Sequence, residues 1–148
     1  MRTLQWLHLV TAGLALLINN SPCAAAPRGA ELDQSFFQHV VQGGEGLDVL
    51  LDPAFKYKTI QNTFLNGHQL IQHLKQGKTK VSSPQIELMM ETQSASSLVT
   101  NGRLTLHLQE ERGMRLVQSE YTHVWIQTDS HWRLLFREAR LIKTPPEK

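Results

Sequence analysis

Two runs rich in β-branched and aromatic residues near the C-terminal end constrain the fold of this chain more than any other feature. The first run covers residues 118–126 and the second covers residues 132–137, and a short polar segment with Asp129 and Ser130 separates them. Such runs favour strands, and a short polar segment between two of them predicts an antiparallel hairpin. We therefore expect the rest of the chain to pack against this hairpin.

The length of the hairpin loop decides which side chains lie together, because side chains alternate between the two faces of a strand. A three-residue loop separates the residues most cleanly and gives one face the residues Tyr121, His123, Trp125, Arg133, Leu135 and Arg137. The other face is then almost wholly apolar, with Val124, Ile126, Trp132, Leu134 and Phe136. A loop of even length would mix the two sets. We predict the three-residue loop, in which Ser130 takes a positive φ that Gly or Asn adopts more easily.

The N-terminal residues have the layout of a secretory signal peptide. Arg2 gives a positive start, residues 4–18 are mostly apolar, and small residues follow Cys23. The apolar run is shorter than the roughly 20 residues that a transmembrane helix needs. We predict a signal peptide over residues 1–25, a single domain over residues 26–143 and a short tail over residues 144–148. The mature protein is then exported, either periplasmic or secreted, and not bound to a membrane.

Removal of residues 1–25 also removes Cys23, the only cysteine, so we expect no disulfide in the mature domain. Lys and Arg number 15 and Asp and Glu number 13 in the whole chain. This near-neutral balance gives no excess of positive charge of the kind that binds nucleic acid or an anionic membrane. We therefore expect neither nucleic acid nor membrane as a partner.

Earlier in the chain, apolar residues recur with helical spacing. They predict helices over residues 31–42, 47–51 and 67–76, with Asn66 as the cap of the last one. A strand is expected over residues 55–60, and strands over residues 85–92, 97–109, 114–127 and 132–142 follow. Helices first and strands last predict an α+β domain with helices on one face of an antiparallel sheet.

The segment from Arg103 to Trp132 resembles the association domain of calcium/calmodulin-dependent protein kinase II. The resemblance is carried by Arg103-Leu104-Thr105, Gln118-Ser119-Glu120, Thr122, Val124-Trp125, Asp129 and Trp132. The same pattern is similar to the wider nuclear transport factor 2-like superfamily, which includes the SnoaL-like proteins. Membership implies a cone, in which three N-terminal helices pack on a strongly bent antiparallel sheet around a pocket. It also implies self-association through the outer face of the sheet.

The resemblance implies cationic side chains in that pocket. Two of the family's positions fall on Arg103 and His123, while a third falls on Ala139, and Arg137 on the same strand face is its expected substitute. An arginine fork grips a carboxylate with two parallel hydrogen bonds. We therefore predict a small anionic ligand bound by Arg103, Tyr121, His123, Trp125 and Arg137. The alternatives are arginines on a solvated sheet face and a histidine hydrogen-bonded at the edge of an aromatic cluster.

Two functions follow from these residues. The first is a non-enzymatic, self-associating domain that binds a small carboxylate. The second is a SnoaL-like isomerase, cyclase or hydratase in which His123 works with a nearby carboxylate; Asp48, Asp52 and Glu138 are the candidates. No cofactor is expected, since no phosphate loop or nucleophile motif occurs. No metal site is expected either, because His68 and His73 are five residues apart and do not share a helix face.

The apolar face of the hairpin also bears on assembly. It joins Leu104, Leu106 and Leu108 of the preceding strand in a surface too large to remain in water. Alternation alone favours a core that packs on the helices, whereas the family resemblance favours an interface between two copies. A bulge near Gly102 would flip part of the face and satisfy both. We predict a homodimer or a higher oligomer.

Overall fold

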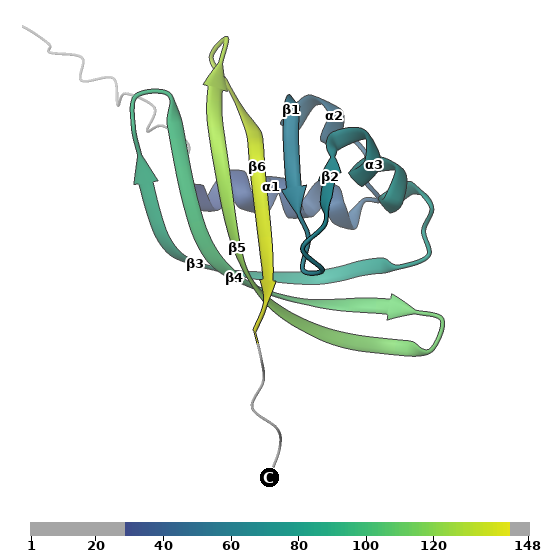
Figure 1. The fold of residues 1–148 in the computed structure, drawn as a ribbon. Helices are drawn as coiled ribbons and strands as arrows, with labels where there is room; N and C mark the ends of the chain where they lie inside the picture. The colour runs from purple at the N-terminus through teal and green to yellow at the C-terminus, as the bar shows by residue number, and fades with distance from the viewer. Residues whose placement is uncertain (1–28, 143–148) are drawn as a thin grey trace, which may run out of the picture.

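The computed structural model describes residues 29–142. The predicted signal peptide over residues 1–25 and the predicted tail over residues 144–148 lie outside the described part. Within it, three helices and six strands form one body, in which the sheet curves around α1 (Figure 1). No helix of residues 29–142 is long and apolar enough to cross a membrane.

The helices agree closely with the prediction in extent. They are α1 (Gly29–Val41), α2 (Leu47–Leu50) and α3 (Gly67–Lys75). As predicted, Asn66 caps α3, and its side chain accepts a hydrogen bond of 2.9 Å from the backbone N–H of Gln69. Two strands, β1 (Leu51–Lys58) and β2 (Phe64–Asn66), precede α3. Three N-terminal helices are not confirmed as an unbroken group. The strand that we expected over residues 55–60 lies largely within β1, and the chain turns extended at Leu51, just before the Asp52-Pro53 pair that disfavours helix.

The remaining strands follow as β3 (Lys80–Gln93), β4 (Ser97–Glu110), β5 (Gly113–Thr128) and β6 (His131–Leu141). The six strands are arranged in the order β2-β1-β6-β5-β4-β3. β1 pairs with β6 in parallel, and the other pairs are antiparallel. The sheet is therefore mixed, and the antiparallel prediction is wrong at this pair. A parallel pair needs a long connection, and α3 with β3 to β5 supplies it here.

The turn between β5 and β6 contains two residues and not the three that we predicted. Thr128 pairs with His131, and both Asp129 and Ser130 have positive φ, at 49° and 65°. Two positive-φ residues in a two-residue loop match the twist of the flanking strands. Ser130 therefore has the backbone conformation that the prediction required of it, in a loop one residue shorter.

A bulge in β6 offsets the shorter turn, so the residues beyond it lie on the faces that we predicted. Trp125 pairs with Leu134 and Val124 pairs with Phe136, so Leu135 is the extra residue. Beyond the bulge Arg137 pairs with His123, so these two residues share a face, as predicted. Between turn and bulge the predicted faces are wrong: Trp132 and Leu134 share a face with Trp125, and Arg133 shares one with Ile126. Leu104 is likewise buried in the core and not part of an outer apolar surface.

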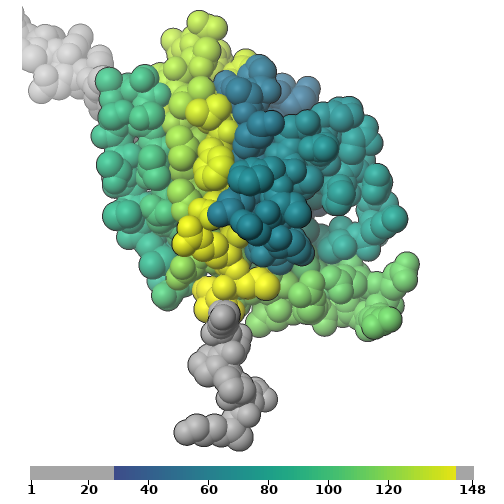
Figure 2. Space-filling view, viewed as in Figure 1, coloured from purple at the N-terminus to yellow at the C-terminus, as the bar shows by residue number. Residues whose placement is uncertain are grey.

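The core lies between the helices and the inner face of the sheet. It is made of large apolar side chains from α1, α2, α3 and five of the strands. The buried members are Phe36, Phe37, Leu47, Leu51, Phe55, Leu70, Leu98, Leu104, Tyr121, Trp125 and Leu134. Figure 2 shows the opposite, outer face of the sheet, on which β6 lies between β1 and β5 and which no helix of residues 29–142 covers.

β3 is an edge strand with two irregularities. Its register against β4 shifts between Ser82 and Gln85 and again between Leu88 and Met90. The second shift lies opposite Asn101 and Gly102, where we predicted a bulge. The bulged residue is Met89 on β3, however, and β4 keeps continuous register with β5 through Gly102. No part of β4 is flipped to the other face.

Candidate functional site

A buried carboxylate on α1 is the centre of the polar groups inside the fold. Asp33 is 0% exposed and faces the inner side of β4 and β5. Its two oxygens accept four hydrogen bonds, from Thr100 Oγ1 (3.0 Å), Tyr121 Oη (2.8 Å), His123 Nδ1 (2.7 Å) and Trp125 Nε1 (3.0 Å). Four convergent donors stabilise the ionised carboxylate in a place where an unpaired one would be very costly.

Arg137 on β6 fixes the protonation of His123. Its Nη1 lies 2.5 Å from His123 Nε2, and a guanidinium can only donate. Nε2 must therefore accept, and the ring proton lies on Nδ1, from which it is donated to Asp33. His123 is a neutral bridge between an anion on α1 and a cation on β6.

The pKa values follow from this arrangement. Burial above all, and then the neighbouring Arg137, lower the pKa of His123 from 6.5 to about 4, although the hydrogen bond to Asp33 opposes them. Burial acts to raise the pKa of Asp33, but the hydrogen bonds from His123, Trp125 and Tyr121 outweigh it and hold this pKa below its usual range. Burial and the charge of Asp33 raise the pKa of Tyr121, so its hydroxyl remains a donor.

The guanidinium of Arg137 sits among aromatic rings. Its Cζ lies 4.9 Å from the ring centroid of Phe37, 5.1 Å from that of Tyr57, 5.3 Å from that of Phe36 and 5.9 Å from that of Tyr121. Cation–π attraction of this kind helps to offset the loss of hydration of a residue that is only 5% exposed. Within residues 29–142, His123 is the only hydrogen-bond acceptor found for this guanidinium.

The structure brings four of the five predicted ligand residues together, namely Tyr121, His123, Trp125 and Arg137. Arg103 does not join them, because it points to the outer face of the sheet, where its side chain is 51% exposed and lies 3.9 Å from Glu120. The prediction that Arg103 shares their face is wrong. Its neighbours in the strand, Gly102 and Leu104, face inward, so alternation directs Arg103 outward. Ala139 and Arg137 do share the inner face, as predicted.

Sequence reasoning missed Asp33, the residue that organises the site, and proposed other carboxylates in its place. Asp48 is exposed, Asp52 accepts a hydrogen bond from the backbone of Ala54, and Glu138 lies on the outer face beside Lys58. A signal was present, since Asp33 precedes Phe36 and Phe37 by three and four residues. It therefore lies on the apolar stripe of its helix, where a charged residue needs partners.

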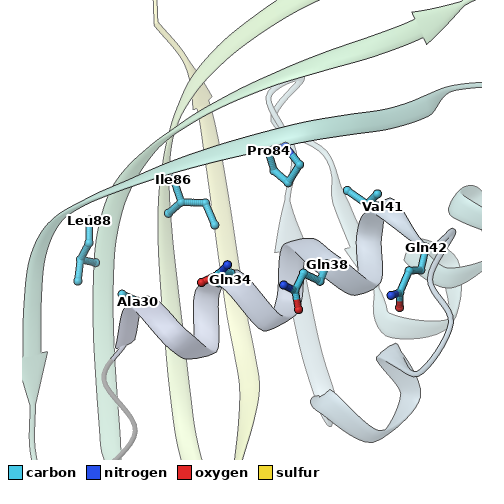
Figure 3. Close-up of a pocket in the computed structure, with 8 residues that line it drawn as sticks. All are labelled: Ala30, Gln34, Gln38, Val41, Gln42, Pro84, Ile86 and Leu88. Carbon is cyan, nitrogen blue, oxygen red and sulfur yellow. The ribbon is translucent and has the colours of Figure 1, made fainter.

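A groove of about 670 Å³ lies between α1 and β3 (Figure 3). Three glutamines on one helix face form one wall, and apolar side chains of β3 form the other. The lining residues are Ala30, Gln34, Gln38, Val41, Gln42, Pro84, Ile86 and Leu88. None of these eight is charged, and none of the five predicted ligand residues is among them.

The bridge formed by His123 predicts a specific loss of stability in acid. The unfolded chain binds a proton near pH 6.5 and the folded chain only near pH 4, so the free energy of unfolding should fall as pH drops through this window. The expected loss between pH 7 and pH 4 is about 3 kcal/mol. Below pH 4 the lowered pKa of Asp33 adds to it. Urea unfolding at pH 7, 5.5 and 4 measures the effect, and a flat profile, or one unchanged in His123→Gln, would contradict the assignment.

Comparisons with known proteins bear on the fold. The sequence matches no family model, and no curated protein is significantly similar to it. Among solved structures, an NTF2-like protein from Cytophaga hutchinsonii has a TM-score of 0.71 at 13% identity, over 76% of this chain and 94% of that one. An NTF2-like protein of unknown function in nutrient uptake from Rhodospirillum rubrum has a TM-score of 0.67 at 15% identity, over 79% of this chain and 100% of that one.

A third similar structure is the CaMKII hub of S. rosetta, with a TM-score of 0.63 at 13% identity, over 79% of this chain and 100% of that one. CaMKII is the kinase whose association domain the sequence resembles, so the predicted likeness is confirmed at the level of structure. Identities this low carry information about fold alone. The chain has the nuclear transport factor 2-like fold, in the form shared by NTF2-like proteins and CaMKII hub domains.

Proposed function

We propose that this protein is an exported, non-enzymatic domain that associates with itself through the outer face of its sheet. The proposal rests chiefly on an apolar band on that face, formed by Val99, Val124, Ile126 and Phe136. Val99 pairs with Val124, and Val124 with Phe136, so the band crosses β4, β5 and β6 without a break. A continuous apolar surface on an uncovered sheet face is typical of a protein–protein interface.

The likeness to hub domains supports the same proposal. The similarity to the CaMKII hub of S. rosetta covers 79% of this chain and the whole of that one. A face used by two identical copies must be complementary to itself, and an apolar band satisfies that condition most simply. The interior of the fold, in contrast, is occupied by the residues around Asp33.

Self-association is tested by the molecular mass of the protein without residues 1–25, measured by sedimentation velocity over a range of concentrations. We expect a dimer or higher oligomer, and we expect Val124→Glu to shift it to monomers by burying a charge in the interface. Val49→Glu is the matched control, because Val49 is 71% exposed on α2, away from the sheet. A monomeric parent protein, or a Val124→Glu variant that remains folded and associated, would refute the proposal.

The export part of the proposal rests on residues 1–25 alone. Expression of the full chain in a bacterial host, followed by N-terminal sequencing of the exported fraction, tests it directly. A mature protein that begins at Ala26 supports the proposed cleavage after Ala25. Full-length protein retained in the cytoplasm contradicts it.

The small carboxylate ligand has one observation in its favour, which is the set of spare donors on Arg137. A guanidinium carries five N–H donors, and within residues 29–142 His123 accepts from only one of its nitrogens. A carboxylate bound there would pair with the positive charge of Arg137, which the surrounding aromatic rings already stabilise. Its binding would therefore bury no additional cation. Isothermal titration with small mono- and dicarboxylates tests this role: binding lost in Arg137→Met supports it, and binding that persists in that variant contradicts it.

The isomerase, cyclase or hydratase alternative has less support from the geometry. His123 is 0% exposed, donates through Nδ1 to Asp33 and accepts through Nε2 from Arg137. Neither ring nitrogen is free to take a proton from a substrate. The Asp33–His123 pair is better explained as a bond that holds α1 on the sheet.

A further inference from the structure

Three glutamines form a row of amides along the α1 wall of the groove between α1 and β3. Gln34, Gln38 and Gln42 are four residues apart, and Gln42 continues the helical turn, since its N–H donates to the carbonyl of Gln38 (3.0 Å). Residues four apart lie one above the other on a helix surface. All three are exposed, and the glutamine side chains found in hydrogen bonds within residues 29–142 are those of Gln69 and Gln109 instead. The amides of the row are therefore available to a ligand.

The opposite wall of the groove is a row of apolar side chains on β3. Pro84, Ile86 and Leu88 are alternate residues of the strand and share a face, and each is partly buried. Figure 3 shows this row running along the glutamines, with Ile86 opposite Gln34 and Pro84 opposite Gln38. The groove thus offers hydrogen-bonding groups on one side and apolar surface on the other.

The spacing of the glutamines matches the repeat of an extended polypeptide. Four residues of a helix rise about 6 Å, and two residues of an extended chain rise about 6.6–6.8 Å. Every second residue of an extended chain presents its N–H and its C=O on the same edge. A glutamine amide has both a donor and an acceptor, so each glutamine can bond one such residue. Over three glutamines the two repeats differ by only about 1–2 Å.

We propose that this groove binds an extended, uncharged segment of a partner protein, about five residues long. One edge of the segment's backbone lies against Gln34, Gln38 and Gln42, and one row of its side chains lies on Ile86 and Leu88. The site is on the helix side of the sheet and includes none of the residues around Asp33. It is therefore independent of the proposed self-association and of the proposed carboxylate ligand.

The composition of the groove determines the chemistry of the segment. None of the eight lining residues is charged, so a charged side chain placed among them would lose hydration without gaining a partner. Small uncharged side chains meet no such cost. A small rigid ligand would reach only one or two of the glutamines, whereas an extended backbone uses all three. The groove therefore fits a neutral peptide segment better than a charged one or a compact molecule.

The glutamines, rather than the edge of β3, supply the hydrogen bonds to the segment. Peptides often bind an exposed strand edge by adding a strand to the sheet. Here the register of β3 shifts between Ser82 and Gln85 and between Leu88 and Met90, and Pro84 has no backbone N–H. An added strand could follow β3 over only a few residues. The row of amides on α1 is regular where this edge is not.

Isothermal titration calorimetry with the end-capped peptide Ser-Val-Ser-Val-Ser tests the site. We expect the parent protein to bind it, and Gln38→Ala to bind about tenfold more weakly, because the central amide makes two hydrogen bonds. The triple variant Gln34→Ala/Gln38→Ala/Gln42→Ala should show no measurable binding. Alanine favours helix at these exposed positions, so the fold should be retained. Gln72→Ala is the matched control, since Gln72 is exposed on α3 outside the groove, and it should bind as the parent does.

A charged peptide tests the neutrality of the site. The end-capped peptide Lys-Val-Glu-Val-Lys should bind at least about tenfold more weakly than the serine peptide. Equal binding of the two peptides would refute the preference for an uncharged segment. Binding of the serine peptide that is unchanged in the triple variant would overturn the inference in favour of addition to the edge of β3. No binding of either peptide at millimolar concentration would overturn it as well.

Sedimentation velocity of the triple variant separates this inference from the proposed function. The variant should associate to the same extent as the parent protein, because the groove and the outer face lie on opposite sides of the sheet. A monomeric parent that binds the peptide through its glutamines would refute self-association and leave this inference intact. Loss of both peptide binding and association in the triple variant, with the fold retained by circular dichroism, would refute the independence of the two sites.

Discussion

Replacement of Asp33 by alanine is expected to lower the free energy of unfolding by about 3–5 kcal/mol. The carboxylate accepts from four side chains of the sheet, and its loss leaves these four donors and the charge of Arg137 buried without a counterpart. Unfolding in urea at pH 7, followed by tryptophan fluorescence, measures the change. Asp48→Ala on the exposed side of α2 is the matched control and should change stability by less than about 0.5 kcal/mol. A loss below about 1 kcal/mol in Asp33→Ala would contradict the account of the site.

The coupling between the charges of Asp33 and Arg137 can be measured by the same unfolding experiment on a double variant. His123 connects Asp33 to Arg137, so removal of either charged group alone leaves the other uncompensated. The double variant Asp33→Asn/Arg137→Met removes both charges and should therefore be less destabilised than the sum of the two single variants. Additive losses would mean that the two charges are not coupled through the histidine.

Replacement of Trp125 by alanine should have an effect of similar size, about 3–5 kcal/mol, because a large aromatic side chain leaves a cavity that the surroundings fill only in part. Trp125 is 0% exposed, pairs with Leu134 across the sheet and donates its Nε1–H to Asp33. Circular dichroism in urea is the suitable measurement, since the substitution removes a fluorophore.

A conservative variant of Trp125 separates its two contributions. Trp125→Phe keeps most of the apolar volume and removes only the donor to Asp33, so we expect a loss of about 1–2 kcal/mol. Trp132→Ala provides the comparison at a site that is only partly buried against the core, and it should cost less than Trp125→Ala. Equal losses in Trp125→Phe and Trp125→Ala would show that the hydrogen bond outweighs the packing.

The helices and strand positions could be predicted from the sequence because they depend on local periodicity. The stripe of Phe36 and Phe37 and the cap at Asn66 are properties of neighbouring residues, and the structure places both as expected. The parallel pairing of β1 with β6 is different, since Leu51 meets Leu134 across most of the chain. No local pattern encodes which distant strands will pair, and β2, with three residues, is too short to give a period.

The candidate site was predicted in part for the same reason. Tyr121, His123 and Trp125 alternate along one strand, so their common face follows from β5 alone. Arg137 reached that face only because the short turn and the bulge at Leu135 offset each other, and nothing in the composition of β6 marks Leu135 as the extra residue. Asp33 lies on a different element altogether, and its role depends on donors that come together only when α1 packs on the sheet.

The irregular edge strand β3 limits what self-association can produce. An exposed strand edge is a template onto which further chains can add without end, as in fibrils. In β3 the register shifts at two places and Pro84 lacks a backbone donor, so a regular ladder can extend over only a few residues. Growth by edge addition is thereby discouraged, whereas the proposed association through the outer face would occupy the whole contact surface of each copy. The proposed assembly would then be finite. A higher protein concentration would give more assemblies and not longer ones.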